Sequence, residues 1–433
     1  MNIDTGSALL KAICVAAVAV LMMIPLAMLK GLIFERTESR ARAVDAVARG
    51  WGGRQSVGGP VIAIPVSIPA EADKVLTREW YVLPDSLEIQ AGVDVAASGR
   101  KVGMYEVPVY AARIQGRARF DIDRQLARLA ARDSSAALHP ERARLLIPIG
   151  DPRGVQGLKV TSGQYTDELE PARAFETPVM MRALPIAPGA GPLEVGVDLQ
   201  IGGTESLAFL PLARATRVSV KGNWPHPGFT RGFLPMTRAV TRSGFEATWQ
   251  VLDLKRSFGS FWLDGQITRE ELDKSAFGVD LVQPVDLYQQ ITRSVKYGGL
   301  FVSLSLLTLF LFERIVGRPL HPIQYGLLAL ALGVFYLLLL ALAEHIGFAC
   351  AYLAAATALC ALLGVYLAGV LRSRAAGGAS GGIYAVVYGL LYLLVTSEDY
   401  SLLAGSIALF ALLATLMVLT RKVDWYGNDA QSG

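Results

Sequence analysis

The chain has 433 residues, of which 52% are hydrophobic and 18% charged, and its mean hydropathy is +0.40. A soluble domain carries about a quarter charged residues, so this composition excludes an ordinary soluble protein, and the high hydrophobicity excludes a disordered one. The charges concentrate in residues 34–294, which hold 32 basic and 30 acidic side chains. We therefore expect a charge-balanced domain between membrane spans, without the strong positive charge that nucleic-acid binding requires.

Six apolar runs predict transmembrane helices. The run at 12–29 is longer than the apolar core of a cleavable signal peptide, so we expect a retained anchor, with Pro25 as a candidate kink. Most of the later runs approach the roughly 20 residues that a bilayer core requires, and the uncharged residues 375–382 can lengthen the fifth. These later runs are 297–312, 322–343, 346–371, 383–395 and 400–419.

The charges of the loops predict the orientation, because basic loops are usually cytoplasmic. Three basic loops fall on one side of the predicted membrane, so we expect both termini to be cytoplasmic and residues 34–294 to be periplasmic in a bacterial inner membrane. Arginines directly after the first span resist this orientation, but a long translocated domain tolerates such charges. The basic loop residues are Arg314, Arg318, Arg372, Arg374, Arg421 and Lys422.

This pattern predicts four parts of the chain. Residues 1–33 form the cytoplasmic N-terminus and helix 1, residues 34–294 form the periplasmic domain, residues 295–422 hold helices 2–6, and residues 423–433 form a short cytoplasmic tail. The periplasmic domain has no cysteine, so it is not a disulfide scaffold.

Most of residues 34–294 have a β pattern. Helical spacing continues through 34–50 until Gly52 and Gly53 break it, and a helix is expected at 122–131. Between these, short β-branched and aromatic runs alternate with turn residues, which favours an antiparallel sandwich or a pair of β-subdomains. The expected strands are 61–68, 78–83, 105–122, 144–149, 193–201, 216–222 and 245–251.

Two polar turns face the predicted periplasm. Glu344 and His345 form nearly the whole turn between spans three and four, where a carboxylate beside an imidazole can bind a cation, sense pH or relay protons. The alternative is a polar hairpin tip at headgroup level. Glu398 and Asp399 lie on the same side and are candidates to cap span six. Together the two turns form an acidic rim that can contact basic residues, with Arg293 among the candidates.

An aromatic segment in the domain is the other candidate site. Trp224, His226, Phe229 and Phe233 lie among prolines that favour extended or turn backbone. Exposed, these rings would form a binding ridge for lipid or glycan; the alternative is a loop packed on the sheet. The sequence contains no metal-ligand spacing, phosphate loop or dinucleotide fingerprint, and it predicts no cofactor.

Several unusual strings, in order along nearly the whole chain, resemble the CreD family of inner-membrane proteins. The membrane half contributes Leu320-His321-Pro322, Glu344-His345 and Asp424-Trp425-Tyr426. The domain contributes Gly58-Gly59-Pro60-Val61-Ile62-Ala63-Ile64-Pro65-Val66, Asn223-Trp224-Pro225-His226-Pro227 and Ser243-Gly244-Phe245-Glu246-Ala247.

This resemblance implies a role in cell-envelope integrity, in envelope-stress and β-lactam responses, and in tolerance to envelope-directed toxins. It supplies no catalytic residues, so we expect a non-enzymatic protein that contacts the bilayer and binds an envelope lipid, glycan or membrane protein. A transporter or lipid-handling protein that uses spans two to six is the alternative. The near absence of charge within those spans argues against ion-coupled transport.

Overall fold

The computed structural model describes 5–69, 75–132, 136–162, 169–187, 189, 191–229, 231–281, 287–316, 320–370, 372–396 and five single residues between 406 and 417. Within it, the chain divides into two compact units. A helical unit comprises Met1–Ser39 and Val285–Gly433, and a β-rich unit comprises Arg40–Pro284.

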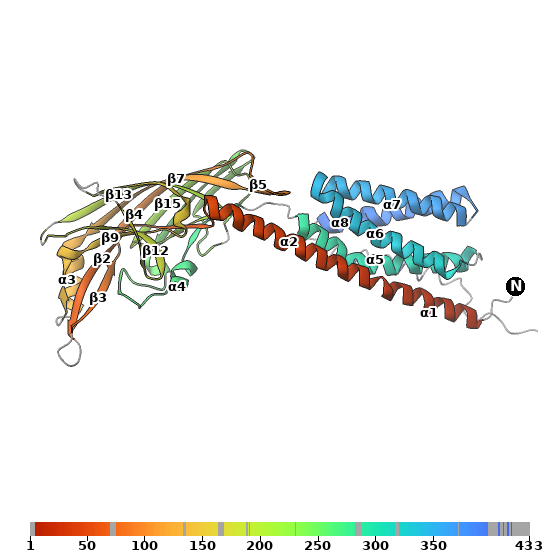
Figure 1. Ribbon diagram of the computed structural model, residues 1–433, viewed down its shortest axis with the longest axis horizontal. Helices are drawn as coiled ribbons and strands as arrows, with labels where there is room; N and C mark the ends of the chain where they lie inside the picture. The colour runs from red at the N-terminus through yellow and green to blue at the C-terminus, as the bar shows by residue number, and fades with distance from the viewer. Residues whose placement is uncertain are drawn as a thin grey trace, which may run out of the picture. The chain divides into compact units, whose positions relative to one another are not determined.

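The β-rich unit contains two seven-stranded sheets (Figure 1). We call the first the large polar-faced sheet, and its strand order is β10-β13-β7-β4-β15-β18-β17. Its strands are β10 (Val155–Ser162), β13 (Pro192–Thr204), β7 (Val109–Asp121), β4 (Ser86–Val95), β15 (Ala215–Gly222), β18 (Gly244–Leu252) and β17 (Thr237–Thr241).

The second seven-stranded sheet has the order β11-β12-β9-β2-β3-β19, with β8 paired to β2. It is built from β11 (Glu170–Ala174), β12 (Thr177–Ala183), β9 (Arg144–Pro148), β2 (Val61–Pro69), β3 (Val75–Val82), β19 (Phe261–Leu263) and β8 (Ala137–Leu138). Smaller sheets contain β1 (Gln55–Gly58), β14 (Ser206–Leu210), β20 (Phe277–Leu281) and β16 (Pro227–Gly228), and the pair β5 (Arg100–Val102) and β6 (Tyr105–Val107).

Strict alternation of burial explains why these segments form strands. In β4, Leu87 and Ile89 are buried while Glu88 and Gln90 are exposed, and the same period of two runs through β7. The inward residues of both seven-stranded sheets belong to one buried cluster, which also includes Trp249 of β18. Six of the seven strands expected from the sequence are present, within a few residues at their ends. The expected strand 105–122 is divided into β6 and β7, which belong to different sheets.

The expected helix at 122–131 is also confirmed. Helix α3 spans Ile122–Arg132 and buries one apolar stripe against the strands. A second short helix, α4 (Arg269–Lys274), begins with a capping box between Thr268 and Glu271.

Most strand pairs are antiparallel, as expected, but two pairs are parallel. Strand β4 pairs in parallel with β15, and β1 pairs in parallel with β14. Strand β4 ends at Val95 and β15 begins only at Ala215. A connection of that length allows a parallel crossover, whereas the sequence pattern of adjacent strands suggested hairpins.

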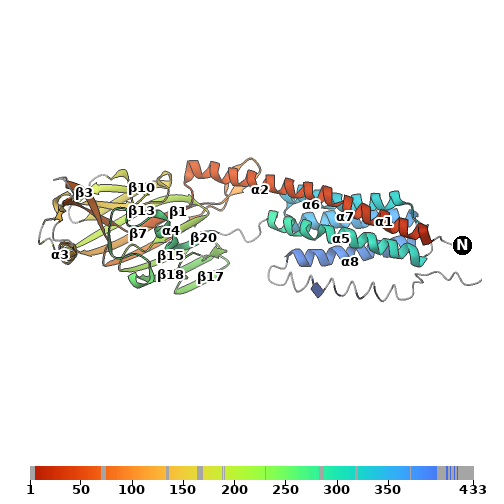
Figure 2. The ribbon, with the colours of Figure 1, turned by 90° about the horizontal axis from the view of Figure 1, so that it is seen from below.

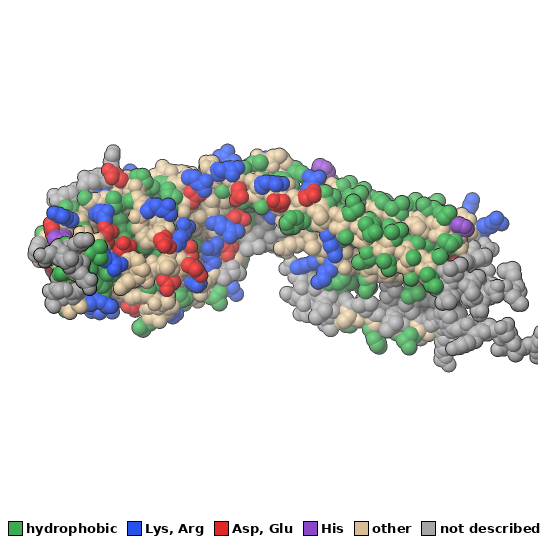
Figure 3. Space-filling view, turned by 60° about the horizontal axis from the view of Figure 1, so that its bottom comes forward, with side chains coloured by type: hydrophobic (Ala, Val, Ile, Leu, Met, Phe, Trp, Pro, Cys, Tyr) green, Lys and Arg blue, Asp and Glu red, His purple; other side chains and the backbone are tan. Residues whose placement is uncertain are grey.

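The helical unit has α1 (Thr5–Leu21), part of α2 (Met23–Trp51), α5 (Leu287–Val316), α6 (Pro322–Ile346), α7 (Phe348–Val370) and α8 (Arg374–Thr396), which lie side by side (Figure 1, Figure 2). Hydrophobic side chains cover much of these helices, while charged side chains gather over the β-rich unit (Figure 3). Helix α8 includes residues 375–382, which confirms the lengthened fifth span.

The expected number of spans needs correction. Within the described residues, four helical stretches are long and apolar enough to cross a membrane, at Ile13–Trp51, Pro322–Ile346, Phe348–Val370 and Arg374–Thr396. The expected span at 297–312 lies inside α5 and is not among these four. Most of the expected span at 400–419 falls outside the described residues.

The anchor helix continues well beyond the apolar run, as expected. Helix α1 gives way to α2 at Met22, just before Pro25, whose missing N–H interrupts the helical hydrogen bonds. Helix α2 then runs to Trp51, whose indole Nε1 donates to the Tyr110 carbonyl at 3.0 Å. Gly52 ends it with φ +105°, a conformation that L side chains rarely adopt.

Small residues allow close packing of α7 and α8. A Cβ added to Gly377 would lie 2.6 Å from the Gly364 carbonyl oxygen, so only glycine permits this approach. Phe335 of α6 contacts the rings of Tyr352 and Tyr388, with ring centroids 5.5 and 4.6 Å away. Ring contacts between the three helices and the close approach of α7 and α8 at Gly364 and Gly377 therefore hold α6 to α8 together.

Candidate functional site

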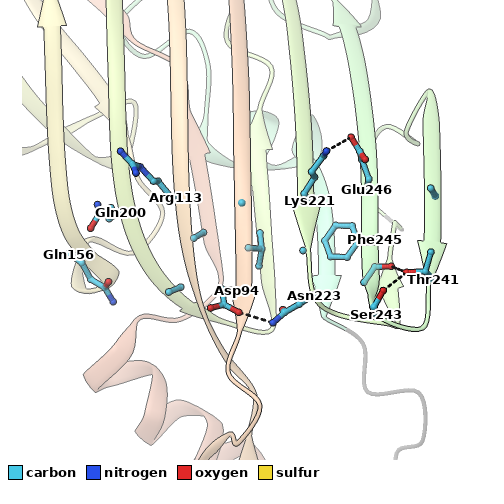
Figure 4. Close-up of a pocket in the computed structure, with 17 residues that line it drawn as sticks. Asp94, Arg113, Gln156, Gln200, Lys221, Asn223, Thr241, Ser243, Phe245 and Glu246 are labelled. Atoms are coloured by element: carbon cyan, nitrogen blue, oxygen red, sulfur yellow. Dashed lines mark hydrogen bonds and ion pairs between the residues drawn. The ribbon is translucent and has the colours of Figure 1, made fainter.

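A shallow groove crosses the outward face of the large polar-faced sheet (Figure 4). The strand registers align five outward residues from five adjacent strands: Gln200, Arg113, Gly92, Lys221 and Glu246. A Cβ added at Gly92 would have no neighbour within 4 Å, so the middle of this row is open. The groove has a volume of about 880 Å³, within the range typical of ligand sites.

Short side chains create the groove. Gly92 of β4, Ala111 of β7 and Ala239 of β17 line it, and each is exposed. Elsewhere on the same strands the outward positions carry long polar side chains such as Gln90 and Gln115, which are also exposed. The groove is therefore a local depression in a surface that is otherwise covered by long polar side chains.

Two ion pairs flank the groove. Arg113 Nη2 lies 2.7 Å from Asp198 Oδ2, and Lys221 Nζ lies 3.1 Å from Glu246 Oε1. The hydrogen bond from Arg113 holds the pKa of the Asp198 carboxyl below its ordinary value. Figure 4 shows Lys221 directed toward Glu246, with Arg113 on the opposite flank near Gln200. Both cations thus lean away from Gly92 and leave its surface open.

One end of the groove is braced by side-chain hydrogen bonds. Asn223 Nδ2 donates to Asp94 Oδ1 at 2.7 Å, while Asn223 Oδ1 accepts from the Val95 N–H at 2.7 Å. Across the groove, the hydroxyl oxygens of Thr241 and Ser243 lie 3.1 Å apart in the β17–β18 turn. Asn223 and Ser243 belong to two of the strings that resemble the CreD family, so the fold brings those strings to one edge.

The aromatic segment mostly packs against the core. Phe229 is 8% exposed and contacts Trp249, while Phe233 contacts Phe277, with centroid distances of 5.8 and 6.2 Å. Trp224 is half-buried, and its Nε1 donates to the carbonyl of His226 at 3.1 Å. Of the four candidate residues, His226 alone is exposed. The alternative of a loop packed on the sheet describes these residues better than an exposed ridge, because their apolar faces complete the core.

Glu344 and His345 were expected to form the turn between two spans, but both lie in the last turn of α6, which ends at Ile346, and their side chains have different surroundings. The side chain of Glu344 is only 8% exposed and accepts a hydrogen bond from Tyr288 of α5 at 3.3 Å. Arg36 of α2 lies 3.5 Å from the same carboxylate oxygen. His345 is exposed, since consecutive helical residues face about 100° apart. We call Arg36, Tyr288 and Glu344 the carboxylate clamp.

The remaining candidates are placed as follows. Glu398 and Asp399 lie outside the described residues. Among the residues that are described, no group of three or more His, Cys, Asp or Glu side chains can hold a metal ion.

The sequence did not point to the groove or to Arg36 as a partner of Glu344. Alternation in β4 and β7 shows which residues face outward, and Gly92 stands out as a short residue there. The neighbours of Gly92 depend on the pairing of β4 with β15, which lies far along the chain. The only local signal was therefore the short side chain itself.

The fold and these sites define a membrane protein with an N-terminal helix, a β-rich unit and further transmembrane helices. The chain belongs to the CreD family: the family model described as Inner membrane protein CreD matches residues 7–426. Inner membrane protein CreD of Escherichia coli strain K12 is 33% identical over 417 residues, covering 94% of this chain and 91% of that protein. The resemblance seen in the sequence is confirmed, and the chain is an inner-membrane protein.

The solved structures include a distant likeness. A Legionella pneumophila protein, described provisionally as nutrient binding, is 9% identical with a TM-score of 0.32, and the match covers 58% of this chain and 79% of that one. That level of likeness supports no inference about this chain.

Proposed function

We propose that this protein supports cell-envelope integrity and the envelope-stress and β-lactam responses by binding an envelope component without catalysis. The groove over Gly92 carries this proposal, because it combines an open floor with charged and amide side chains on a rigid sheet. The β-rich unit, corresponding to the expected domain 34–294, is the binding part, and the transmembrane helices hold it at the membrane.

The carboxylate clamp supports a periplasmic location for the β-rich unit. Arg36 lies just before the unit begins at Arg40, and Tyr288 lies just after it ends at Pro284. Both contact Glu344, at the end of α6. Helix α7 begins directly after α6, at Phe348, and runs from there toward Arg372 and Arg374. Because basic loops are usually cytoplasmic, both chain entries to the unit belong to the opposite, periplasmic side.

The charges in the groove support binding rather than acid–base catalysis. A general base works best when its pKa lies near the operating pH. The pKa of Asp198 is instead lowered by the hydrogen bond from Arg113, so this carboxylate stays ionised and paired. The side chain of Glu246 is likewise engaged with Lys221.

A complementation experiment tests the proposal. Cells that lack the gene should become sensitive to detergents or β-lactams, and the wild-type chain should restore resistance. Gly92→Trp fills the groove and should fail to restore it. Gln90→Trp is the matched control, since Gln90 is exposed on the same strand and face but does not line the groove. Equal rescue by both variants, or a deletion without any envelope phenotype, refutes the proposal.

Lipid handling is a second candidate, favoured by an apolar groove of about 810 Å³ between α7 and α8. Its lining includes Tyr352, Leu353 and Gly389 and no charged residue, so it suits an acyl chain better than an ion. A photoactivatable fatty-acyl lipid should label the wild-type chain but label Gly389→Trp weakly. Gly369→Trp is the control, because both glycines have open space at Cβ and Gly369 does not line the groove. Equal labelling of the two variants excludes this function.

A further inference from the structure

The charges that line the groove balance. Asp94 and Glu246 supply two negative charges, and Arg113 and Lys221 supply two positive charges. Both cations already have carboxylate partners, at 2.7 and 3.1 Å. A polyanion would have to compete with those carboxylates and approach Asp94, whereas an uncharged polar ligand meets no such repulsion.

Unused hydrogen-bonding groups lie on one flank. Gln156 of β10 and Gln200 of β13 are exposed in the groove, and neither side chain forms a hydrogen bond within the described part of the chain. Each amide offers two donors and one acceptor. The flanking ion pairs also keep spare donors and acceptors, because Arg113 has five N–H groups and a carboxylate has about four acceptor positions. A ligand rich in hydroxyl or amide groups can satisfy both kinds of partner.

The floor suits the less polar face of such a ligand. Gly92 and Ala111 expose backbone and short side chains, and Phe245 does not offer an exposed ring because it is 5% exposed and packed over Gly222. Arg113 and Lys221 stand two strand spacings apart, about 10 Å, with the register placing Gly92 between them. The row continues to Gln200 and Glu246, so an extended ligand can lie across the strands.

From this arrangement we propose that the groove binds an uncharged glycan chain whose sugars carry N-acetyl groups, with the chain crossing the strands over Gly92. Sugar hydroxyl groups both donate and accept, which matches the paired charges of the flanks. The N-acetyl amide matches Gln156 and Gln200, and the ring faces cover the short residues of the floor. This inference rests on the proposed function, since it names the ligand class of the same groove.

Calorimetric titration of the full-length protein in lipid nanodiscs tests the ligand class. We expect N,N′,N″-triacetylchitotriose to bind saturably and trigalacturonate, an acidic trisaccharide of similar size, to bind at least about tenfold more weakly. Gly92→Trp should weaken triacetylchitotriose binding by about tenfold or more, and Gln90→Trp should not. The double variant Gln156→Ala with Gln200→Ala should weaken it while leaving thermal unfolding unchanged, because both side chains are exposed.

Three results overturn the inference: no saturable binding of triacetylchitotriose, equal binding by Gly92→Trp and wild type, or tighter binding of trigalacturonate. The two proposals fail separately. If Gly92→Trp abolishes rescue in cells but triacetylchitotriose does not bind, the groove keeps its function and the glycan class is wrong. If triacetylchitotriose binds as expected but Gly92→Trp rescues fully, the glycan class stands and the proposed role in the envelope is wrong.

Discussion

Replacing Glu344 by alanine should destabilise the helical unit. The carboxylate is 8% exposed and joins three helices, α2 through Arg36, α5 through Tyr288 and its own α6. Its removal leaves the Tyr288 hydroxyl without this acceptor and releases Arg36 from one partner. We therefore expect separation of α2 and α5 from α6 to become easier.

The size of the effect follows from the two contacts. A hydrogen bond to a charged group contributes about 1.5–3 kcal/mol. The Arg36 contact is 3.5 Å long and Arg36 is 41% exposed, so solvent limits it to at most about 1 kcal/mol. Glu344→Ala should thus cost roughly 1.5–4 kcal/mol. Glu344→Gln keeps an acceptor for Tyr288 and should cost about 1 kcal/mol or less.

A thiol-reactive fluorescent dye can follow thermal unfolding in detergent. Cys14 and Cys360 are partly buried and report opening of the helices, whereas exposed Cys350 would react at once and is replaced by alanine in every variant. His345→Ala is the matched control, because it is the neighbouring residue and is exposed. The reasoning is refuted if Glu344→Ala and His345→Ala unfold at the same temperature.

Three further predictions concern the β-rich unit, each followed by thermal or denaturant unfolding of the full-length protein. Arg256→Met should leave stability unchanged or raise it, because burial lowers the pKa of Arg256 to about 10 and its three side-chain nitrogens have no hydrogen-bond partner; a clear loss of stability would contradict this. Asp151, partly buried, accepts hydrogen bonds from Arg153 and the Gly53 N–H, which lower the pKa of its carboxyl. The stabilising effect of the ionised carboxylate is therefore present above the ordinary aspartate pKa of about 4 and is lost as the pH falls below it. Asp151→Asn should then make the free energy of unfolding depend less on pH at acid pH. An unchanged pH dependence of the free energy of unfolding counts against this. Gly52→Ala should lower the melting temperature, since φ is +105° and an added Cβ would lie 2.6 Å from the Gly202 carbonyl oxygen; an unaltered melting temperature would show that the turn can relax.

Local patterns explain what could be predicted. The alternation of β7, the helical spacing of α3 and the apolar runs of α6 and α7 each depend on residues a few positions apart. The loop charges likewise depend on sequence order alone. The strands, α3 and several spans could therefore be expected without tertiary information, as could the membrane location once the resemblance to the CreD family was recognised.

The tertiary structure decided which local elements meet. Lys221 lies in a strand that the sequence predicted, whereas β4, which carries Gly92, was not among the expected strands. Only the parallel pairing of β4 with β15 makes Gly92 and Lys221 neighbours and opens the groove. From the sequence, Glu344 was expected in a polar turn at the membrane surface. Only the packing of α2 and α5 against α6 surrounds it with Arg36 and Tyr288. Side-chain period is set by adjacent residues, whereas register and helix contacts are set by the burial of a whole core. The sequence by itself therefore determined the elements and their faces, and the sites arose from long-range pairing.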